Sequence, residues 1–363
     1  MQSKSGKTDG ILLVLVLFLT TFGLVVLYSM SAYNGQVRFG DSAYYFKKQF
    51  FAMTLGLAAM YWISTLDYHL LLRYSIPAYA LSLLLSAAVL LFGDAYNGSR
   101  RWLSIGPLSF QPAEYAKPAV ILLLAGIVSR MDSKKSGPTI AAVLLLVLPV
   151  VGLVGTNNLS TAVIILGIAV LMIFISNPRY LPFVRILLGG SGFLGIFLSL
   201  ESYRLERLAI WRHPELYEKG YQTMQGLYAI GSGGLFGRGL GESLQKLGFV
   251  PEAQNDMIFA VICEELGLIG ALLLILLFLL LIWRFMVIAT HAPDLSGTLI
   301  AAGIMGHIAI QVILNIAVVT NSIPNTGITL PFVSYGGTSV LFLLAEMGLA
   351  LSVSRCSTYP GKR

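Results

Sequence analysis

Residues 257–284 read MIFAVICEELGLIGALLLILLFLLLIWR, and this stretch decides the class of fold. Its residues 266–283 carry no charged side chain, and about 20 apolar residues suffice to cross a bilayer as a helix. Similar apolar runs recur along the whole chain. They predict ten membrane spans, at 11–31, 47–66, 74–92, 112–130, 138–154, 159–176, 181–200, 257–284, 296–320 and 334–354.

The composition agrees with this interpretation. Of the 363 residues, 56% are hydrophobic and 11% are charged, whereas a soluble domain carries roughly 25% charged residues. The apolar run from Ile11 to Met30 is too long for the core of a signal peptide, so we interpret it as a retained first span. We therefore predict an all-α integral membrane protein of about ten transmembrane helices, organised as a single polytopic domain over 1–363. A long extracytoplasmic loop, 201–256, is predicted between helices seven and eight.

The distribution of lysine and arginine predicts the orientation of the spans, because cytoplasmic loops are richer in both residues. With the N-terminus inside, the inner face holds Lys4, Lys7, Arg73, Arg130, Lys134, Lys135, Arg179, Arg284, Arg355, Lys362 and Arg363. The short outer loops hold only Arg38, Lys47, Lys48, Arg100 and Arg101. Both termini are therefore predicted to be cytoplasmic, and the polar segments 93–111 and 201–256 share the outer face. The short connection 155–158 is the critical point, because merging the fifth and sixth spans would place these segments on opposite faces.

The formal net charge of +7 does not predict binding to nucleic acid, because the basic residues are scattered in short loops. Positive charge beside membrane spans more often orients helices and meets anionic lipid headgroups. Cys263 and Cys356 fall in a predicted span and in the C-terminal tail, and they predict neither a disulfide nor a zinc site. The glycine-rich run 231–241 lacks the spacing and the strand-to-helix context of a nucleotide-binding loop.

The first outer segment places charged side chains beside the predicted fourth span. Arg100, Arg101 and Trp102 are candidates for substrate binding, although snorkelling arginines with an interfacial aromatic anchor have the same pattern. Glu114 and Lys117 lie three residues apart, so they share one helix face and can pair. Ionisable residues within a span are costly and indicate a functional site by default. The structural alternative is a buried ion pair that only fixes helix packing.

Asp256 lies at the outer mouth of the predicted eighth span, where an aspartate either caps the helix or carries chemistry. Glu264 and Glu265 follow two to three turns deeper, and carboxylates there must be paired or neutral. The last outer loop, 321–338, is uncharged but rich in Pro, Gly and hydroxyl residues, Ser334 among them. Non-helical backbone at membrane depth must be buried or line a wet cavity. We expect these outer segments to line one shared cavity.

Taken together, these segments resemble the SEDS family (shape, elongation, division and sporulation) of bacterial cell-wall polymerases. The matching pieces occur in the family's order, with its ten-helix layout, at 97–103, 111–117, 220–241, 249–267 and 324–337. The resemblance implies a peptidoglycan glycosyltransferase of the bacterial cytoplasmic membrane that acts on lipid II at the outer leaflet. From 203–208 and 292–295 the division branch looks closer than the elongation branch, and a sporulation paralogue looks similar.

The resemblance also implies roles for residues and partners. The family's essential acidic residue corresponds to Asp256. Where many relatives have Pro-Asp-Leu-Gly-Thr, this chain has Asn157-Asn158-Leu159-Ser160-Thr161, which argues against a mechanism that requires a second acid there. The implied partners are a class B penicillin-binding protein transpeptidase and other divisome proteins.

The expected reaction joins two lipid-linked sugars. Asp256 is expected to act as general base for the 4-hydroxyl of an N-acetylglucosamine, an assistance worth about 10²–10⁴-fold. The pyrophosphate leaving group needs positive charge, which Arg100, Arg101, Lys117 and Arg207 can supply. The full set of expected substrate contacts is Arg100, Arg101, Trp102, Glu114, Lys117, Arg207, Glu265 and Ser334.

Two rival functions and a cofactor are also compatible with the sequence. A flippase for lipid-linked oligosaccharides would need a polar route across the membrane, and only the outer half supplies clustered charges. A non-catalytic scaffold would recruit a transpeptidase without polymerising anything. No ligand cluster predicts a metal site, although a divalent cation, Mg²⁺ or Mn²⁺, could share the neutralisation of the pyrophosphate.

Overall fold

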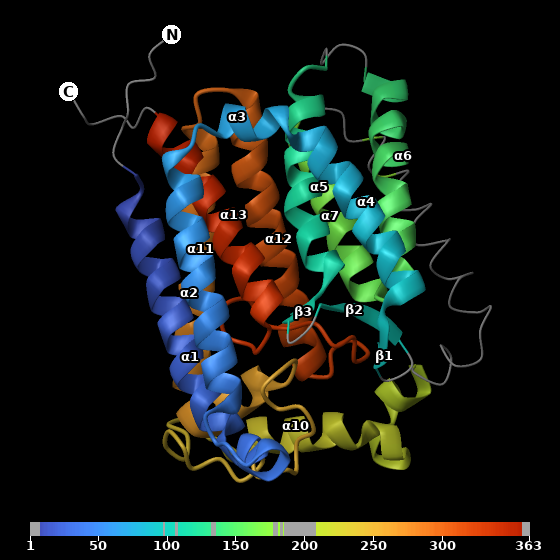
Figure 1. Cartoon of the computed structure of the whole chain (residues 1–363). Helices are drawn as coiled ribbons and strands as arrows, with labels where there is room; N and C mark the ends of the chain where they lie inside the picture. Colours follow the sequence, from blue (N-terminus) through green and yellow to red (C-terminus); the bar gives the residue numbers. More distant parts are fainter. Residues whose placement is uncertain are drawn as a thin grey trace.

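The computed structural model describes residues 8–96, 99–105, 108–131, 136–176, 181, 184 and 208–357. Long helices run side by side in one bundle (Figure 1). The start of α1 (Gly10–Phe39) and the end of α13 (Gly337–Cys356) lie at one end of the bundle, together with α3 (Tyr68–Arg73). The three short strands and α10 (Tyr221–Ser232) lie at the opposite end. The two polar segments therefore share one end of the bundle.

The predicted spans correspond closely to helices. The other helices are α2 (Tyr44–Thr65), α4 (Ser75–Phe92), α5 (Pro112–Val128), α6 (Ser136–Gly155), α7 (Leu159–Ser176), α11 (Ile258–Thr290), α12 (Leu295–Val319), η1 (Pro214–Leu216) and η2 (Glu218–Gly220). Among the described residues, six helices are long and apolar enough to cross a membrane: α1, α4, α7, α11, α12 and α13. The prediction of an all-α, multi-pass membrane protein is confirmed.

Three further predicted spans, at 47–66, 112–130 and 138–154, coincide with α2, α5 and α6. Because α6 and α7 are separate helices on either side of 155–158, the fifth and sixth spans do not merge. The seventh predicted span, 181–200, lies outside the described residues apart from Leu181 and Val184. Aspartates cap three of the described helices, since Asp9 accepts from the Leu12 N–H, Asp67 from the His69 N–H and Asp294 from the Gly297 N–H.

Both polar segments contain regular structure that the sequence analysis did not predict. In 93–111, β1 (Asp94–Tyr96) pairs antiparallel with β2 (Ser99–Ile105), which pairs antiparallel with β3 (Leu108–Phe110). In the described part of 201–256, the chain forms η1, η2 and α10. These elements give this end of the bundle a fixed framework on which polar side chains can be placed.

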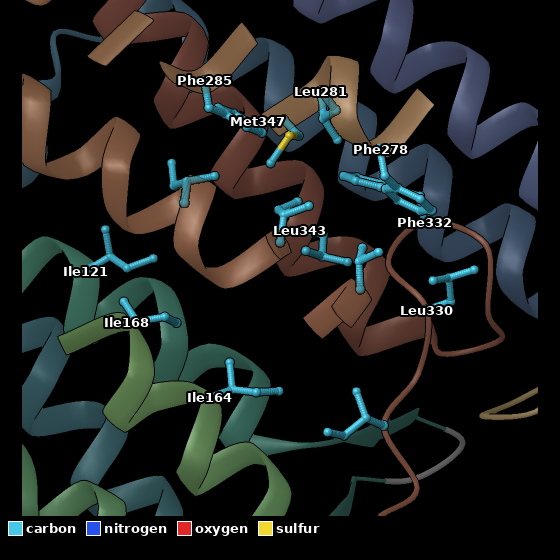
Figure 2. Packing of buried hydrophobic residues seen from close by; sticks show 14 of the residues in the cluster. Ile121, Ile164, Ile168, Phe278, Leu281, Phe285, Leu330, Phe332, Leu343 and Met347 are labelled. Carbon is cyan, nitrogen blue, oxygen red and sulfur yellow. The ribbon is translucent and has the colours of Figure 1, made fainter. Parts of the chain in front are cut away.

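Apolar packing holds the loop 321–336 among the helices (Figure 2). Phe278 and Phe285 of α11 and Met347 of α13 are buried in one cluster, which also includes Leu330 and Phe332 of the loop 321–336. That loop is therefore inserted into the bundle rather than laid over it. This insertion fixes the position of the polar atoms that the loop carries.

Candidate functional site

Asp256 lies in the turn that precedes α11, and the residue is only 8% exposed. Gln222 of α10 donates a hydrogen bond from Nε2 to Asp256 Oδ1 at 3.3 Å. Gln222 Oε1 in turn accepts from Asn325 Nδ2 at 3.2 Å. The N-cap residue of α11 is Met257, and no side chain caps the helix there. Asp256 is therefore not the helix cap that was the alternative to a chemical role.

Asn315 of α12 holds the backbone around Asp256. This asparagine is fully buried, and its Nδ2 donates to the carbonyl of Asp256 at 2.9 Å and to that of Ile328 at 2.7 Å. One amide thus joins the turn before α11 to the loop 321–336. Gly327 of this loop has φ 69°, and a Cβ placed there would lie 3.9 Å from Asp256 Oδ2. The loop backbone therefore passes close to the carboxylate.

Burial changes the acidity of Asp256. Loss of hydration disfavours the carboxylate and raises the pKa of Asp256 from 3.8 to about 7, and the negative charge of Glu252 acts in the same direction. Hydrogen bonds from the backbone N–H of Asp256, from Gln222 and from the backbone N–H of Met257 oppose this shift, because they stabilise the ionised form. A carboxyl whose pKa lies near neutral pH can take up and release a proton under physiological conditions, as a general base must.

A second polar cluster joins α5 to α12. Lys117 Nζ lies 3.0 Å from Glu114 Oε2 and donates to Gln311 Oε1 at 3.2 Å, and all three residues are buried. Gln311 Nε2 donates to the carbonyl of Thr329 at 3.0 Å. The expected pair of Glu114 and Lys117 is therefore present. Through Gln311 it is connected to the residue that follows Ile328 in the loop beside Asp256.

The sequence analysis missed the residues of α12 that organise both clusters. His307, Gln311 and Asn315 are spaced four apart, so they lie on one helix face, and each is at most 2% exposed. His307 Nδ1 lies 2.7 Å from Glu346 Oε2 of α13, and His307 Nε2 lies 2.9 Å from Gln311 Oε1. Polar residues at this spacing within an apolar span were the signal that could have identified them.

The predicted substrate contacts Arg100, Arg101 and Trp102 lie on β2. Arg100 Nη1 donates to the carbonyl of Leu90 at the end of α4, at 3.2 Å. Arg101 Nε donates to the carbonyl of Asn157 in the turn between α6 and α7, at 2.8 Å. Arg100, Arg101 and Asn157 line a pocket between α4, α5 and α6, which we call the arginine pocket.

The turn between α6 and α7 connects the arginine pocket to the loop beside Asp256. Asn158 Oδ1 accepts from the Thr161 N–H at 3.1 Å, as an N-cap of α7 does. Ser160 Oγ donates to the carbonyl of Thr326 at 2.9 Å. The asparagine that stands where the SEDS pattern has an aspartate thus serves as a helix cap. The turn between α6 and α7 therefore contacts both Arg101 of the arginine pocket and the loop 321–336 beside Asp256.

Glu265, an expected substrate contact, is 1% exposed and lies 2.9 Å from Lys246 Nζ. Its neighbour Glu264 accepts from the Ser243 hydroxyl and lies 3.5 Å from Arg238 Nη1. Both carboxylates therefore bind residues 238–246 of the 201–256 segment to α11. Ion pairs of this kind offset the cost of burying two acids.

Ser334 and Arg207 complete the set of expected contacts. Ser334 Oγ accepts from the Leu330 N–H at 2.8 Å, and Gln49 Nε2 donates to the Ser334 carbonyl at 3.3 Å. Ser334 thus fixes the shape of the loop 321–336. Arg207 lies outside the described residues. In the described part of the chain, no three His, Cys, Asp or Glu side chains group as metal ligands, and the divalent cation, Mg²⁺ or Mn²⁺, stays a prediction.

The family model for FtsW, RodA and SpoVE, described as "Cell cycle protein", matches residues 10–359. The chain belongs to this family. Stage V sporulation protein E of Bacillus subtilis is 40% identical and covers 99% of this chain and 100% of its own length. A probable peptidoglycan glycosyltransferase FtsW of Thiomicrospira cyclica is 38% identical, over 95% of this chain and 91% of its own. The resemblance to the SEDS family is thereby confirmed, with sporulation and division relatives at similar identity.

Solved structures share the fold over nearly the whole chain. A structure described as "Structural coordination of polymerization and crosslinking by a peptidoglycan synthase complex" matches with a TM-score of 0.80 at 32% identity. The match covers 96% of this chain and 98% of that chain. Rod shape determining protein RodA of Thermus thermophilus matches with a TM-score of 0.72 at 30% identity, over 97% and 98% of the two chains. The helical bundle is therefore that of the family.

Proposed function

We propose that this chain is a peptidoglycan glycosyltransferase that polymerises lipid II into glycan strands, with Asp256 as the general base. Glycosyltransferase activity follows from membership of the family and from relatives that carry this activity in their names. One observation carries the assignment of the base. Asp256 is a buried carboxyl with a pKa of about 7, and it is held by Gln222 and Asn315.

In the proposed reaction, the 4-hydroxyl of an N-acetylglucosamine attacks the anomeric carbon of a lipid-linked donor sugar. A new glycosidic bond forms while the bond from that carbon to the pyrophosphate oxygen breaks, and undecaprenyl pyrophosphate leaves with the electron pair. The carboxylate of Asp256 takes the proton of the attacking hydroxyl. Because a neutral hydroxyl is a poor nucleophile, this transfer lowers the barrier, by a factor of about 10²–10⁴ in rate.

Positive charge for the pyrophosphate comes, in this proposal, from Arg100 and Arg101 of the arginine pocket. Guanidinium groups form strong charge-assisted hydrogen bonds with phosphate. Lys117 Nζ already contacts Glu114 and Gln311. We therefore assign Lys117 a positioning role, in which it orients Gln311 and with it the loop 321–336. Trp102 stays a proposed substrate contact on β2.

We place the protein in the bacterial cytoplasmic membrane with both termini inside, as the distribution of lysine and arginine predicts. The end of the bundle that carries β1–β3 and α10 is then extracytoplasmic, and lipid II reaches it in the outer leaflet. The similar solved structure comes from a peptidoglycan synthase complex described as coordinating polymerization and crosslinking, which supports a crosslinking partner for this chain. We propose that this partner is a class B penicillin-binding protein transpeptidase, accompanied by other divisome proteins.

Polymerisation of fluorescent lipid II by the purified full-length protein tests this proposal. Asp256→Asn should lower the rate at least about 10²-fold without loss of folding, because the change removes a charge that burial already penalises. Asp41→Asn is the matched control, since it makes the same change at an exposed carboxylate paired with Lys47, and it should leave the rate unchanged. Wild-type activity in a folded Asp256→Asn protein excludes Asp256 as the base.

The same preparation distinguishes the rival functions. Exchange of lipid II between the leaflets of a vesicle without polymer would support a flippase. Neither polymer nor exchange, in the presence of the crosslinking partner, would support a scaffold.

A further inference from the structure

The helix α11 is interrupted at Gly267, whose φ of 67° and ψ of −169° are not helical. Such a break removes helical partners from backbone N–H and C=O groups on either side of it. Four backbone hydrogen bonds to the glycine-rich segment replace them. These bonds run from Leu268 N to Gly234 O at 2.9 Å, Ile269 N to Leu235 O at 3.2 Å, Arg238 N to Glu264 O at 2.9 Å, and Gly239 N to Glu265 O at 3.0 Å. The segment 234–239 is thus joined to α11 by its main chain.

Three glycines allow this contact, because the two backbones touch. A Cβ at Gly233 would lie 1.9 Å from the carbonyl oxygen of Cys263, and one at Gly237 would lie 2.2 Å from that of Glu265. A Cβ at Gly267 would lie 2.3 Å from the nitrogen of Gly237. Side chains at these positions are incompatible with the observed packing. The glycine-rich run therefore fits against α11 at this depth of the bundle.

Exposed tryptophans at the opposite end of the bundle indicate how deep in the membrane the contact between segment 234–239 and α11 lies. Trp283 of α11 is 53% exposed and Trp62 of α2 is 65% exposed, and both lie toward the end of the bundle where α3 lies. Exposed tryptophans of membrane proteins gather at the bilayer interface. Ile269 precedes Trp283 by 14 residues, which is ~21 Å of helix, whereas the hydrocarbon core is ~30 Å thick. Leu235, bonded to Ile269, then lies ~9 Å inside the outer boundary of the core.

The exposed side chains of the segment suit this depth. Leu235 is 61% exposed and Phe236 is 79% exposed. Beside them, Leu268, Ile269 and Leu272 of α11 are 50%, 44% and 55% exposed. These side chains form one apolar surface that continues from the lipid-facing side of α11 onto the segment. Water is a poor solvent for such a surface, and lipid acyl chains are a good one.

We propose that residues 233–241 form a re-entrant loop whose tip, Leu235 and Phe236, inserts into the hydrocarbon of the outer leaflet. Its occupant is lipid acyl chain, and its base is fixed to the protein by the pair of Glu265 with Lys246. The loop sets the height of the site relative to the leaflet. Asp256 lies 11 residues before the break at Gly267, on the side of the break away from Trp283, which puts it toward the outer surface of the leaflet. That is the headgroup region, where the sugars of a lipid-linked substrate lie.

Site-directed spin labelling of the full chain in lipid nanodiscs tests the insertion, independently of any polymerase activity. Single cysteines replace Phe236, Glu242 or Leu272 in a background with Cys263→Ala and Cys356→Ala. Collisions of the label with oxygen report hydrocarbon, and collisions with a water-soluble nickel chelate report water. Leu272 is the lipid-facing control on α11, and the exposed Glu242 is the control on the same segment outside the tip.

The label at 236 should match the label at 272, with oxygen contact several-fold above nickel contact, and the label at 242 should show the reverse. Nickel contact at 236 equal to that at 242 would overturn the insertion. A second measurement is made after the inferred crosslinking partner has been added. If adding it removes oxygen contact at 236 but not at 272, the tip is a protein interface and the proposal fails. The readout is unaffected if Asp256 proves not to be the base, so the two proposals fail separately.

Discussion

The variants Gln222→Leu and Glu252→Gln should shift the pH dependence of polymerisation in opposite directions. Asp256 acts as a base only when ionised, and its pKa is raised to about 7. The rate should therefore fall as pH falls through 7. About 9% of the carboxyls are ionised at pH 6 and about 91% at pH 8, which gives about a tenfold change in rate. With the ordinary pKa of 3.8 the rate would be flat over this range.

Each variant removes one influence on the carboxyl. The hydrogen bond from Gln222 Nε2 stabilises the ionised form, so Gln222→Leu should raise the midpoint. Glu252 disfavours ionisation through its negative charge, so Glu252→Gln should lower it. A hydrogen bond to a charged group contributes about 1.5–3 kcal/mol, and one pKa unit corresponds to about 1.4 kcal/mol. Because Gln222 bonds Asp256 at the longer distance of 3.3 Å, we expect a shift of about one unit.

The assay measures kcat/KM for fluorescent lipid II between pH 5.5 and 9, since this quantity reports the free enzyme. Asp41→Asn, which alters only an exposed acid, should reproduce the wild-type profile and so corrects for ionisation of the substrate. A flat wild-type profile would refute the raised pKa of Asp256, the observation on which the base assignment rests. So would midpoints that move in the same direction, or not at all, in the two variants.

Three further predictions concern packing, positioning and sidedness. Lys117→Met should cost about 3–5 kcal/mol of unfolding free energy, because it leaves Glu114 buried without its partner. Adding Glu114→Gln should recover most of that loss. If the costs of the two substitutions simply add in a double-mutant cycle, the two side chains are not coupled. Asn315→Leu leaves the buried carbonyls of Asp256 and Ile328 without their donor, at about 1–3 kcal/mol each. It should lower both the midpoint of thermal unfolding and the rate of polymerisation. An unchanged midpoint would show that Asn315 does not stabilise this part of the fold. In a background without native cysteines, Glu242→Cys should react with an impermeant thiol reagent on cells whose outer barriers have been opened, whereas Thr290→Cys should react only after lysis. Labelling in the opposite pattern would reverse the orientation and place Asp256 in the cytoplasm.

The sequence alone determined the class of fold and most of the helices, because hydrophobicity is a local property that needs no knowledge of neighbours. Ten spans could be placed by counting apolar residues, and all the described ones coincide with helices. The pair of Glu114 and Lys117 was also predictable, since a spacing of three residues brings two side chains together on any helix. Asp256 was identified by its charge at the end of an apolar run. Its burial was not predictable.

Tertiary structure alone decided how Asp256 is held and what surrounds it. The carboxyl has a pKa near neutral pH because α10, α12 and the loop 321–336 exclude water from it, and these segments are far apart in the sequence. Glu265 was expected to contact substrate, but the fold pairs it with Lys246 instead. The break at Gly267 was equally hidden, since an apolar run with a glycine predicts a continuous helix as well as an interrupted one. Which of the two forms depends on whether a second backbone supplies the missing hydrogen bonds, and that is a property of the folded chain.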